Sequence, residues 1–236
     1  AGYGFIGFVD DYIKVVKKRN LGLTPRQKLL MQIIVAACYL LAMHVSGDRS
    51  TMLVIPLVGQ IDLGLFYYPF VVFVLLAVTN AVNLTDGIDG LASCVTLVVA
   101  VGFMAVSSIL GFFEINILAR ARGGPCLGFL VWNFNPAKIF MGDTGSMFLG
   151  GLVGALAFGV GLPILLVPMG IVYVCEAGSV ILQVISFKTT GKRIFKMSPI
   201  HHHFEMSGWS EMKIDLIFSL VAAAGCAIGV WLVTTL

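Results

Sequence analysis

Aspartates stand at the ends of apolar stretches in three separate segments of the chain. Asp10 and Asp11 follow the apolar opening, Asp86 and Asp89 lie in a short turn, and Asp143 precedes another apolar run. Carboxylates beside hydrocarbon are costly, so five of them in such places indicate a function that requires them. Carboxylate oxygens suit Mg²⁺, and a divalent cation neutralises anionic phosphate groups. These residues therefore predict a cation site that acts on phosphates.

The first segment, GFVDDYIKVVKK, places a lysine shortly after two aspartates. On a helix, Lys14 shares a face with Asp10 or Asp11, which precede it by four and three residues. Neighbouring aspartates point about 100° apart on a helix, so we expect only one of them to face a given metal. A solvated helix end with a local ion pair explains this segment equally well.

The second segment, NAVNLTDGIDGLA, spaces two amides and two carboxylates three residues apart, at Asn80, Asn83, Asp86 and Asp89. These side chains share a face if the segment stays helical. If the chain turns at Gly87, Asp86 or Asp89 caps the following helix. Ordinary turn chemistry accounts for one or two such residues, and four of them together favour a functional role.

The third segment, NPAKIFMGDTGSMFLGG, has Asp143, Thr144 and Ser146 just before the apolar run 147–162. We expect these three side chains to cap that helix. The first amides of the helix would then face the predicted site, where they suit phosphate oxygens.

The fourth segment, KMSPIHHHFEMSGW, contains three consecutive histidines, His201, His202 and His203. Adjacent side chains diverge, so zinc binding is a weak interpretation, whereas imidazoles beside lysines suit diphosphate oxygens or proton transfer. Glu176 and Gln183 lie within an apolar stretch. Helix–helix hydrogen bonding is the simplest role for Glu176, and Gln183 is close enough to the polar end to reach the site.

The elements that position these residues are membrane helices. Hydrophobic residues make up 58% of the 236-residue chain and charged residues 11%, with a mean hydropathy of +0.98. Soluble domains carry about 25% charged residues, which excludes a water-soluble globule. The apolar blocks are long enough for spanning helices and lack the alternation of a barrel. We expect one all-α polytopic domain over 1–236, with a partial span at 1–9 and seven spans at 29–45, 65–83, 90–111, 112–134, 145–162, 163–187 and 214–235.

Charge placement orients these spans. The loops 14–28, 135–144 and 187–213 carry all but three of the 15 lysines and arginines, which predicts that this face is cytosolic. The segment 50–64 is too short to span and predicts a small hairpin, centred near Gly59, on the opposite face. The string ARARGGP interrupts the fourth span, and three interpretations stay open: it lines the bundle interior, it breaks the span, or the printed sequence is imperfect there.

Together the four segments resemble the polyprenyl-phosphate N-acetylhexosamine-1-phosphate transferase superfamily and, within it, the phospho-N-acetylmuramoyl-pentapeptide-transferase family. The resemblance covers essentially the whole chain and implies ten membrane helices, so we expect N-terminal spans to be missing here. It implies transfer of phospho-N-acetylmuramoyl-pentapeptide from UDP-N-acetylmuramoyl-pentapeptide to undecaprenyl phosphate, giving lipid I and UMP. It also implies Mg²⁺ as cofactor, a homodimer in the bacterial inner membrane, a cytoplasmic active site, and no nucleic-acid partner.

The resemblance also assigns roles to residues. Asp143 would be the main Mg²⁺ ligand, with Asp86 and Asp89 as further ligands, and Asp10 would be the base for the lipid phosphate. Asp11 and His201 would be the other catalytic residues. The remaining positions would bind substrate: Lys14, Lys28, Asn80, Asn83, Asn133, Phe140, Gln183, His202 and His203, together with Asp86 and Asp89. Phe140 offers a face for uracil, and we favour direct attack by the lipid phosphate over a covalent aspartyl intermediate.

Two alternatives stay open. Another enzyme of the superfamily, using UDP-N-acetylglucosamine, would share the aspartates, although the string PIHHHFE favours the muramoyl-pentapeptide reaction. A cation or metabolite transporter would also place carboxylates near the membrane. Transporters bind substrate near mid-depth, whereas these aspartates gather at one interface.

Overall fold

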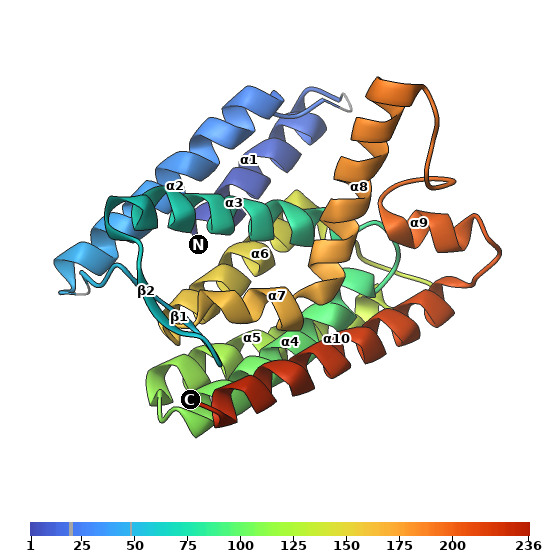
Figure 1. Cartoon of the computed structure of the whole chain (residues 1–236). Coiled ribbons are helices and arrows are strands. Elements are labelled where there is room, and N and C mark those ends of the chain that lie inside the picture. The colour runs from blue at the N-terminus through green and yellow to red at the C-terminus, as the bar shows by residue number, and fades with distance from the viewer. Residues whose placement is uncertain (19–20, 48) are drawn as a thin grey trace.

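A computed structural model describes residues 1–18, 21–47 and 49–236 of the chain, with the exception of the side chain of Arg122. Arg19, one of the basic residues expected on the cytosolic face, lies outside the described residues. The fold is a bundle of helices with one small hairpin, which confirms the predicted all-α class (Figure 1). The longer helices are α1 (Gly2–Val16), α2 (Pro25–Val45), α3 (Tyr67–Thr85), α4 (Leu91–Ile109), α5 (Phe113–Asn133), α6 (Gly142–Gly159), α8 (Ile171–Thr190) and α10 (Glu211–Thr234).

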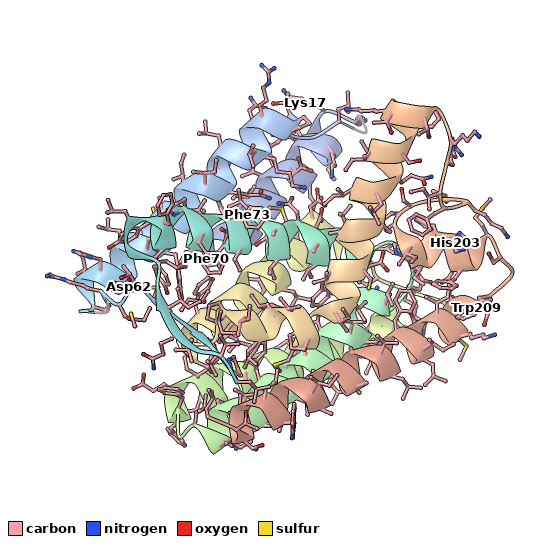
Figure 2. The ribbon with its side chains drawn as sticks, in the orientation of Figure 1. Lys17, Asp62, Phe70, Phe73, His203 and Trp209 are labelled. Atoms are coloured by element: carbon pink, nitrogen blue, oxygen red, sulfur yellow. The ribbon has the colours of Figure 1, made fainter. Side chains whose placement is uncertain are left out.

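Five helical segments of the described chain are long and apolar enough to cross a membrane: Pro25–Val45, Gly64–Thr85, Leu91–Ile109, Ile171–Thr190 and Glu211–Thr234. Their outward faces carry exposed apolar side chains, such as Phe73 on α3, which is 69% exposed (Figure 2). An apolar surface of this extent suits lipid rather than water. The chain is therefore a multi-pass membrane protein.

The predicted span 163–187 is divided in the structure. Two short helices, η2 (Pro163–Leu165) and α7 (Leu166–Met169), end at Gly170, and α8 then continues to Thr190. A third short helix, η1 (Gly64–Phe66), leads into α3, and α9 (Ile200–Glu205) contains the histidine run.

The ARARGGP string lies in the continuous helix α5, which passes through Pro125. The string therefore does not break the helix. The side chain of Arg120 is exposed, so it does not line the bundle interior.

The predicted hairpin is present as β1 (Met52–Ile55) and β2 (Gly59–Asp62). The strands are antiparallel and Ile55 pairs with Gly59, so the chain turns at 56–58, before Gly59 rather than around it. The hydroxyl of Thr51 donates to Asp62 Oδ1 at 2.5 Å and closes the open end of the hairpin.

Helix α6 packs against both α1 and α3, and this contact sets the geometry of the bundle (Figure 1). A Cβ added at Gly150 would lie 2.6 Å from the Thr79 Cα, and one added at Gly7 would meet the backbone carbonyl of Asp143. Glycine therefore permits both close approaches, as at other membrane helix interfaces. Two apolar clusters fill the bundle, one around Phe103 and Leu156 and one around Ile6 and Met147.

We predict that Gly7→Ala destabilises the protein by about 1–3 kcal/mol, because its methyl group would push α1 away from the Asp143 backbone. The measurement is thermal unfolding in a fixed detergent. Gly128→Ala is the matched control, because a Cβ at this position in α5 meets nothing within 4 Å. Equal melting temperatures for the two variants would contradict the close packing of α1 on α6.

Candidate active site

Asp143, in the first turn of α6, accepts hydrogen bonds from three other helices. Lys14 Nζ of α1 lies 2.9 Å and Lys28 Nζ of α2 lies 3.2 Å from Asp143 Oδ2. Asn83 Nδ2 of α3 donates to Asp143 Oδ1 at 2.7 Å. Lys14 also contacts Asp10 Oδ2 at 2.6 Å and Asp11 Oδ1 at 3.6 Å, which confirms the helix face predicted from the spacing.

Asp10 and Asp11 are each fixed by a second element. Asp10 is 3% exposed and its Oδ1 accepts from the Leu23 backbone N–H at 2.6 Å. Asp11 Oδ2 accepts from the Thr144 N–H at 2.9 Å and from the Thr144 hydroxyl at 2.8 Å. One oxygen each of Asp10, Asp11 and Asp143 lie within 4.8 Å of one another. Both adjacent aspartates therefore have an oxygen near Asp143 of α6, and the expectation that only one of them faces a metal stays a prediction.

The predicted capping of α6 is wrong. The helix begins at Gly142, with Met141 at the N-cap position and no side-chain cap. Ser146 instead donates to the Gly142 carbonyl at 2.7 Å and accepts from Asn83 Nδ2 at 2.8 Å, while Thr144 binds Asp11. The helix starts earlier than the apolar run, so residues expected as caps lie inside it and support the aspartates.

The charges of this cluster favour a cation. Three carboxylates from α1 and α6 face the ammonium groups of Lys14 and Lys28. Burial, together with the negative charges of Asp143 and Asp11, raises the pKa of the nearby Asp86 to about 7. Carboxylate oxygens are the donors that Mg²⁺ prefers, so Asp10, Asp11 and Asp143 fit a magnesium ion chemically.

The polar turn after α3 does not cap α4. Asp86 ends α3, and Gly90, with φ +84°, precedes α4 without any side-chain cap. Asp89 Oδ2 instead accepts from the Ala137 N–H at 2.8 Å and joins the turn to the segment before α6. Asn80 points to α2, where it exchanges hydrogen bonds of 2.9 and 3.2 Å with Gln32.

A cavity of about 210 Å³ lies beside this turn. Asp86, Asp89, Asn133 and Phe140 contribute to its walls, and the Phe140 ring is 75% exposed. Asn133 Nδ2 donates to the Ile139 carbonyl at 3.0 Å and shapes the segment that carries Phe140. Asp86 and Asp89 thus line the cavity and are not part of the three-carboxylate group, and their assignment as metal ligands stays a prediction.

His201 is fully buried, unlike the expected phosphate-facing imidazole. Its Nδ1 lies 3.0 Å from Oε2 of Glu176, which is also fully buried in α8. Among the described residues its Nε2 has no hydrogen-bond partner, and the ring packs against Gly87, where a Cβ would collide with it. The His201 ring therefore packs directly against the turn 86–89 at Gly87 and helps to hold its shape.

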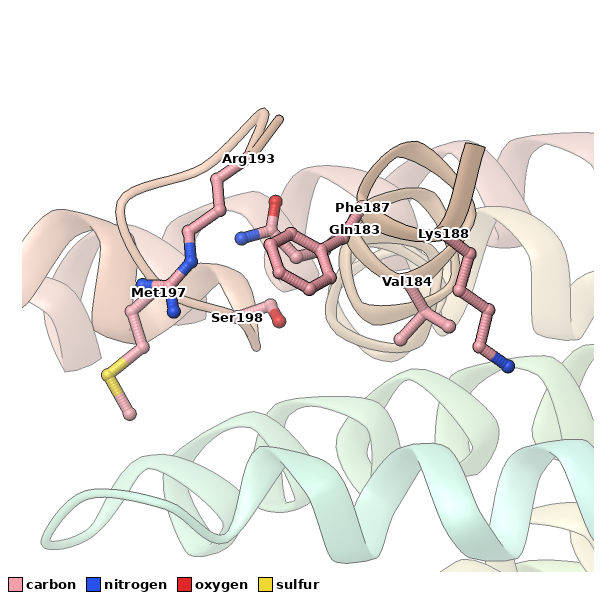
Figure 3. Close-up of a pocket in the computed structure, with 7 residues that line it drawn as sticks. All are labelled: Gln183, Val184, Phe187, Lys188, Arg193, Met197 and Ser198. Atoms are coloured by element: carbon pink, nitrogen blue, oxygen red, sulfur yellow. The ribbon is translucent and has the colours of Figure 1, made fainter. Parts of the chain in front are cut away.

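The other two histidines bind within their own segment. His202 Nδ1 lies 2.7 Å from Glu205 Oε2, and His203 Nδ1 accepts from the Lys196 N–H at 3.1 Å. Gln183 binds the same segment, since its amide contacts the backbone of Phe195 at 3.0 Å. Gln183 also lines a separate cavity, shown in Figure 3. These contacts leave the substrate roles of the three residues as predictions.

Sequence reasoning missed one supporting residue and the partner of another. Gln32, which binds Asn80, is 1% exposed, and a glutamine inside the apolar string LLMQIIV was the available signal. Glu176 was noticed as a carboxylate within a span, but its pairing with His201 joins positions 25 residues apart and has no local signature.

We predict that Glu176→Ala destabilises the protein by about 1–3 kcal/mol, because His201 Nδ1 would lose its acceptor in a buried site. Glu176→Gln retains a carbonyl acceptor and should keep most of that stability. Thermal unfolding of both variants in one detergent tests this. An alanine variant as stable as the unaltered protein would contradict the structural role of the pair.

Comparisons with known proteins identify the family of the chain. The family model described as Glycosyl transferase family 4 matches residues 1–161. The phospho-N-acetylmuramoyl-pentapeptide-transferase of Acetivibrio thermocellus is 50% identical over 97% of this chain and 70% of its own length. The enzyme of the same name from Clostridium perfringens strain 13 is 51% identical over 97% of this chain and 72% of its own length. The enzyme of Halalkalibacterium halodurans is 49% identical over 98% of this chain and 71% of its own. The chain therefore belongs to glycosyl transferase family 4 and to the family of these phospho-N-acetylmuramoyl-pentapeptide-transferases.

Proposed function

We propose that the protein transfers phospho-N-acetylmuramoyl-pentapeptide from its UDP carrier to undecaprenyl phosphate, forming lipid I and releasing UMP. The observation that carries this proposal is the cluster of Asp10, Asp11 and Asp143 with Lys14 and Lys28. Both reactants are anionic phosphates, so their approach requires positive charge. The relatives' name supports the choice of the muramoyl-pentapeptide donor over UDP-N-acetylglucosamine.

The chain's own residues supply the positioning and the proton transfer. Lys14 and Lys28 bind the phosphate oxygens of donor and acceptor. Asp10 accepts the proton of the lipid phosphate, whose oxygen then bonds to the sugar-linked phosphorus as the bond to UMP breaks. Asp11 and Asp143 would hold Mg²⁺, which would supply positive charge to the diphosphate, and Asp10 beside them would act as the base.

The cavity beside the turn 86–89 is our proposed nucleotide site. Phe140 presents an exposed ring on which uracil can stack. Asp86, Asp89 and Asn133 provide polar atoms around it. A flat ring with hydrogen-bonding edges requires this pairing of an aromatic face with polar groups.

An apolar groove provides a place for the lipid acceptor. The groove has a volume of about 430 Å³ and lies between α3, α7 and α8, with Phe70, Val74, Val174 and Ile181 in its walls. The same helix α3 carries Asn83, which binds Asp143 near its other end. A polyprenyl chain in the groove therefore has its phosphate directed along α3 toward the aspartates.

Two further assignments belong to this proposal. The concentration of lysines and arginines in the loops around the cluster supports a cytoplasmic active site. A homodimer in the bacterial inner membrane is the assembly that we propose from the family resemblance.

We predict that Asp143→Asn lowers UMP formation by about a hundredfold or more, because the change removes a negative ligand and leaves Lys28 without its carboxylate partner. Its melting temperature should change little, because asparagine has the same shape and its amide oxygen can still accept from Asn83. Asp62→Asn, in the exposed hairpin, is the matched control and should retain full turnover. Full activity of Asp143→Asn at ordinary Mg²⁺ concentrations would refute its role.

We also predict that chelation abolishes turnover and that Mg²⁺ restores it. The assay measures UMP released from UDP-N-acetylmuramoyl-pentapeptide and undecaprenyl phosphate by purified protein, with and without EDTA. Turnover that persists after chelation would show that the reaction does not require a divalent cation.

The two alternatives predict different products in the same assay. UMP release from UDP-N-acetylglucosamine alone would favour the other transferases of the superfamily. Solute flux into proteoliposomes without nucleotide turnover would favour a transporter.

A further inference from the structure

Helix α2 has few buried side chains with which to pack against the rest of the bundle. Of its 21 described residues, Gln32 and Ala36 are the two that are buried, and they lie four residues apart on one face. Lipid provides no hydrophobic force between helices, so apolar contact of this extent defines the alignment of α2 only weakly. A buried glutamine amide, in contrast, requires a partner at a definite place. The alignment of α2 therefore depends on what Gln32 binds.

Gln32 of α2 and Asn80 of α3 form a reciprocal pair of hydrogen bonds. Gln32 Nε2 donates to Asn80 Oδ1 at 3.2 Å, and Asn80 Nδ2 donates to Gln32 Oε1 at 2.9 Å. Asn80 Nδ2 also donates to the Leu76 carbonyl at 2.8 Å, so both of its hydrogens are engaged within the protein. A shift of α2 along α3 would break both bonds between the amides and leave Gln32 buried without a partner. The pair therefore favours a single alignment of the two helices.

Asn80 lies on a helix that is itself fixed. Its neighbour Thr79 lies where α3 approaches α6, since a Cβ added at Gly150 would lie 2.6 Å from the Thr79 Cα. Helix α6 carries Asp143 in its first turn. The amide pair therefore aligns α2, through α3, with the helix that carries Asp143.

Lys28 is the residue of α2 whose contact with the aspartate cluster depends on this alignment. It lies one turn before Gln32, on the same face of the helix. Its Nζ lies 3.2 Å from Asp143 Oδ2, and its side chain is 20% exposed. A lysine enclosed to this extent has few other rotamers with which to compensate for a shift of its helix. The place of the Lys28 ammonium group therefore follows the place of Gln32.

We propose that Gln32 is a positioning residue of the transferase. Through its amide pair with Asn80 it aligns α2 so that the Lys28 ammonium group meets the phosphate oxygens of the reactants beside Asp143. The inference rests on the proposed function. Gln32 acts through Lys28 and does not touch the substrate. A displacement of about 1 Å in a group that orients the reactants can lower the rate by about a hundredfold, so the effect of Gln32 on turnover is measurable.

The test measures UMP release from UDP-N-acetylmuramoyl-pentapeptide by full-chain protein in nanodiscs. Gln32→Leu removes both amide hydrogen bonds and keeps the backbone carbonyl that accepts from the Tyr3 hydroxyl. It should lower kcat/KM about tenfold or more. Gln60→Leu makes the same change in the exposed strand β2 and should leave kcat/KM unchanged. An unchanged kcat/KM in Gln32→Leu would overturn the inference.

An exchange of the two amides provides a rescue. Gln32→Asn and Asn80→Gln each alter the length of one side of the pair, so each should lower kcat/KM about tenfold. The double variant restores a pair of the same total length and should recover kcat/KM to within about threefold of the unaltered protein. A double variant no more active than Asn80→Gln alone would assign Asn80 to the substrate and overturn the inference.

A double-mutant cycle tests the action through Lys28. If Gln32 works by placing Lys28, then Gln32→Leu should change kcat/KM little in a Lys28→Gln background. Losses that multiply would show that Gln32 acts on the fold independently of Lys28, which would overturn the inference while the unaltered protein still releases UMP. If the unaltered protein releases no UMP, the proposed function fails and the inference fails with it.

Discussion

The meeting of four helices at the carboxylate of Asp143 is the constraint on which the site depends. Lys14, Lys28 and Asn83 reach it from α1, α2 and α3, while Asp143 itself lies in the first turn of α6. A partly buried carboxylate must be compensated, and three donors from separate helices do so. Each contact also fixes the distance between two helices. The hydrogen bonds that stabilise the charge therefore also determine where Asp10 and Asp11 lie relative to it.

Close packing of α1 on α6 makes this meeting possible. At Gly7 the backbone of α1 touches the backbone of Asp143, so side chains only one turn further along, at Asp10 and Asp11, face the start of α6. Lipid provides no hydrophobic force between helices, and tight backbone contact must supply the attraction instead. Chemistry and membrane packing thus impose the same requirement, a residue without a side chain at position 7.

Sequence patterns predicted what depends on local spacing. Apolar length located the helices, and the interval from Asp10 to Lys14 predicted their ion pair. Sequence patterns failed to predict contacts between residues that lie far apart in the chain. A cap on the following helix was one of the roles left open for Asp89, but this residue binds the Ala137 N–H, 48 residues away. The start of α6 was misplaced because polar residues that usually end an apolar run lie inside this helix, where Thr144 binds Asp11.

The buried pair of Glu176 and His201 shows how a polar group inside the bundle can affect the site without entering it. Removing two such groups from water is costly, and their contact offsets only part of that cost. The pair joins α8 to α9, and the imidazole then fills the space that Gly87 leaves beside the turn 86–89. A side chain at position 87 would displace the ring, and loss of the ring would leave the turn unsupported. His201 is therefore the member of the histidine run that acts on the shape of the turn 86–89, and it does so from α9.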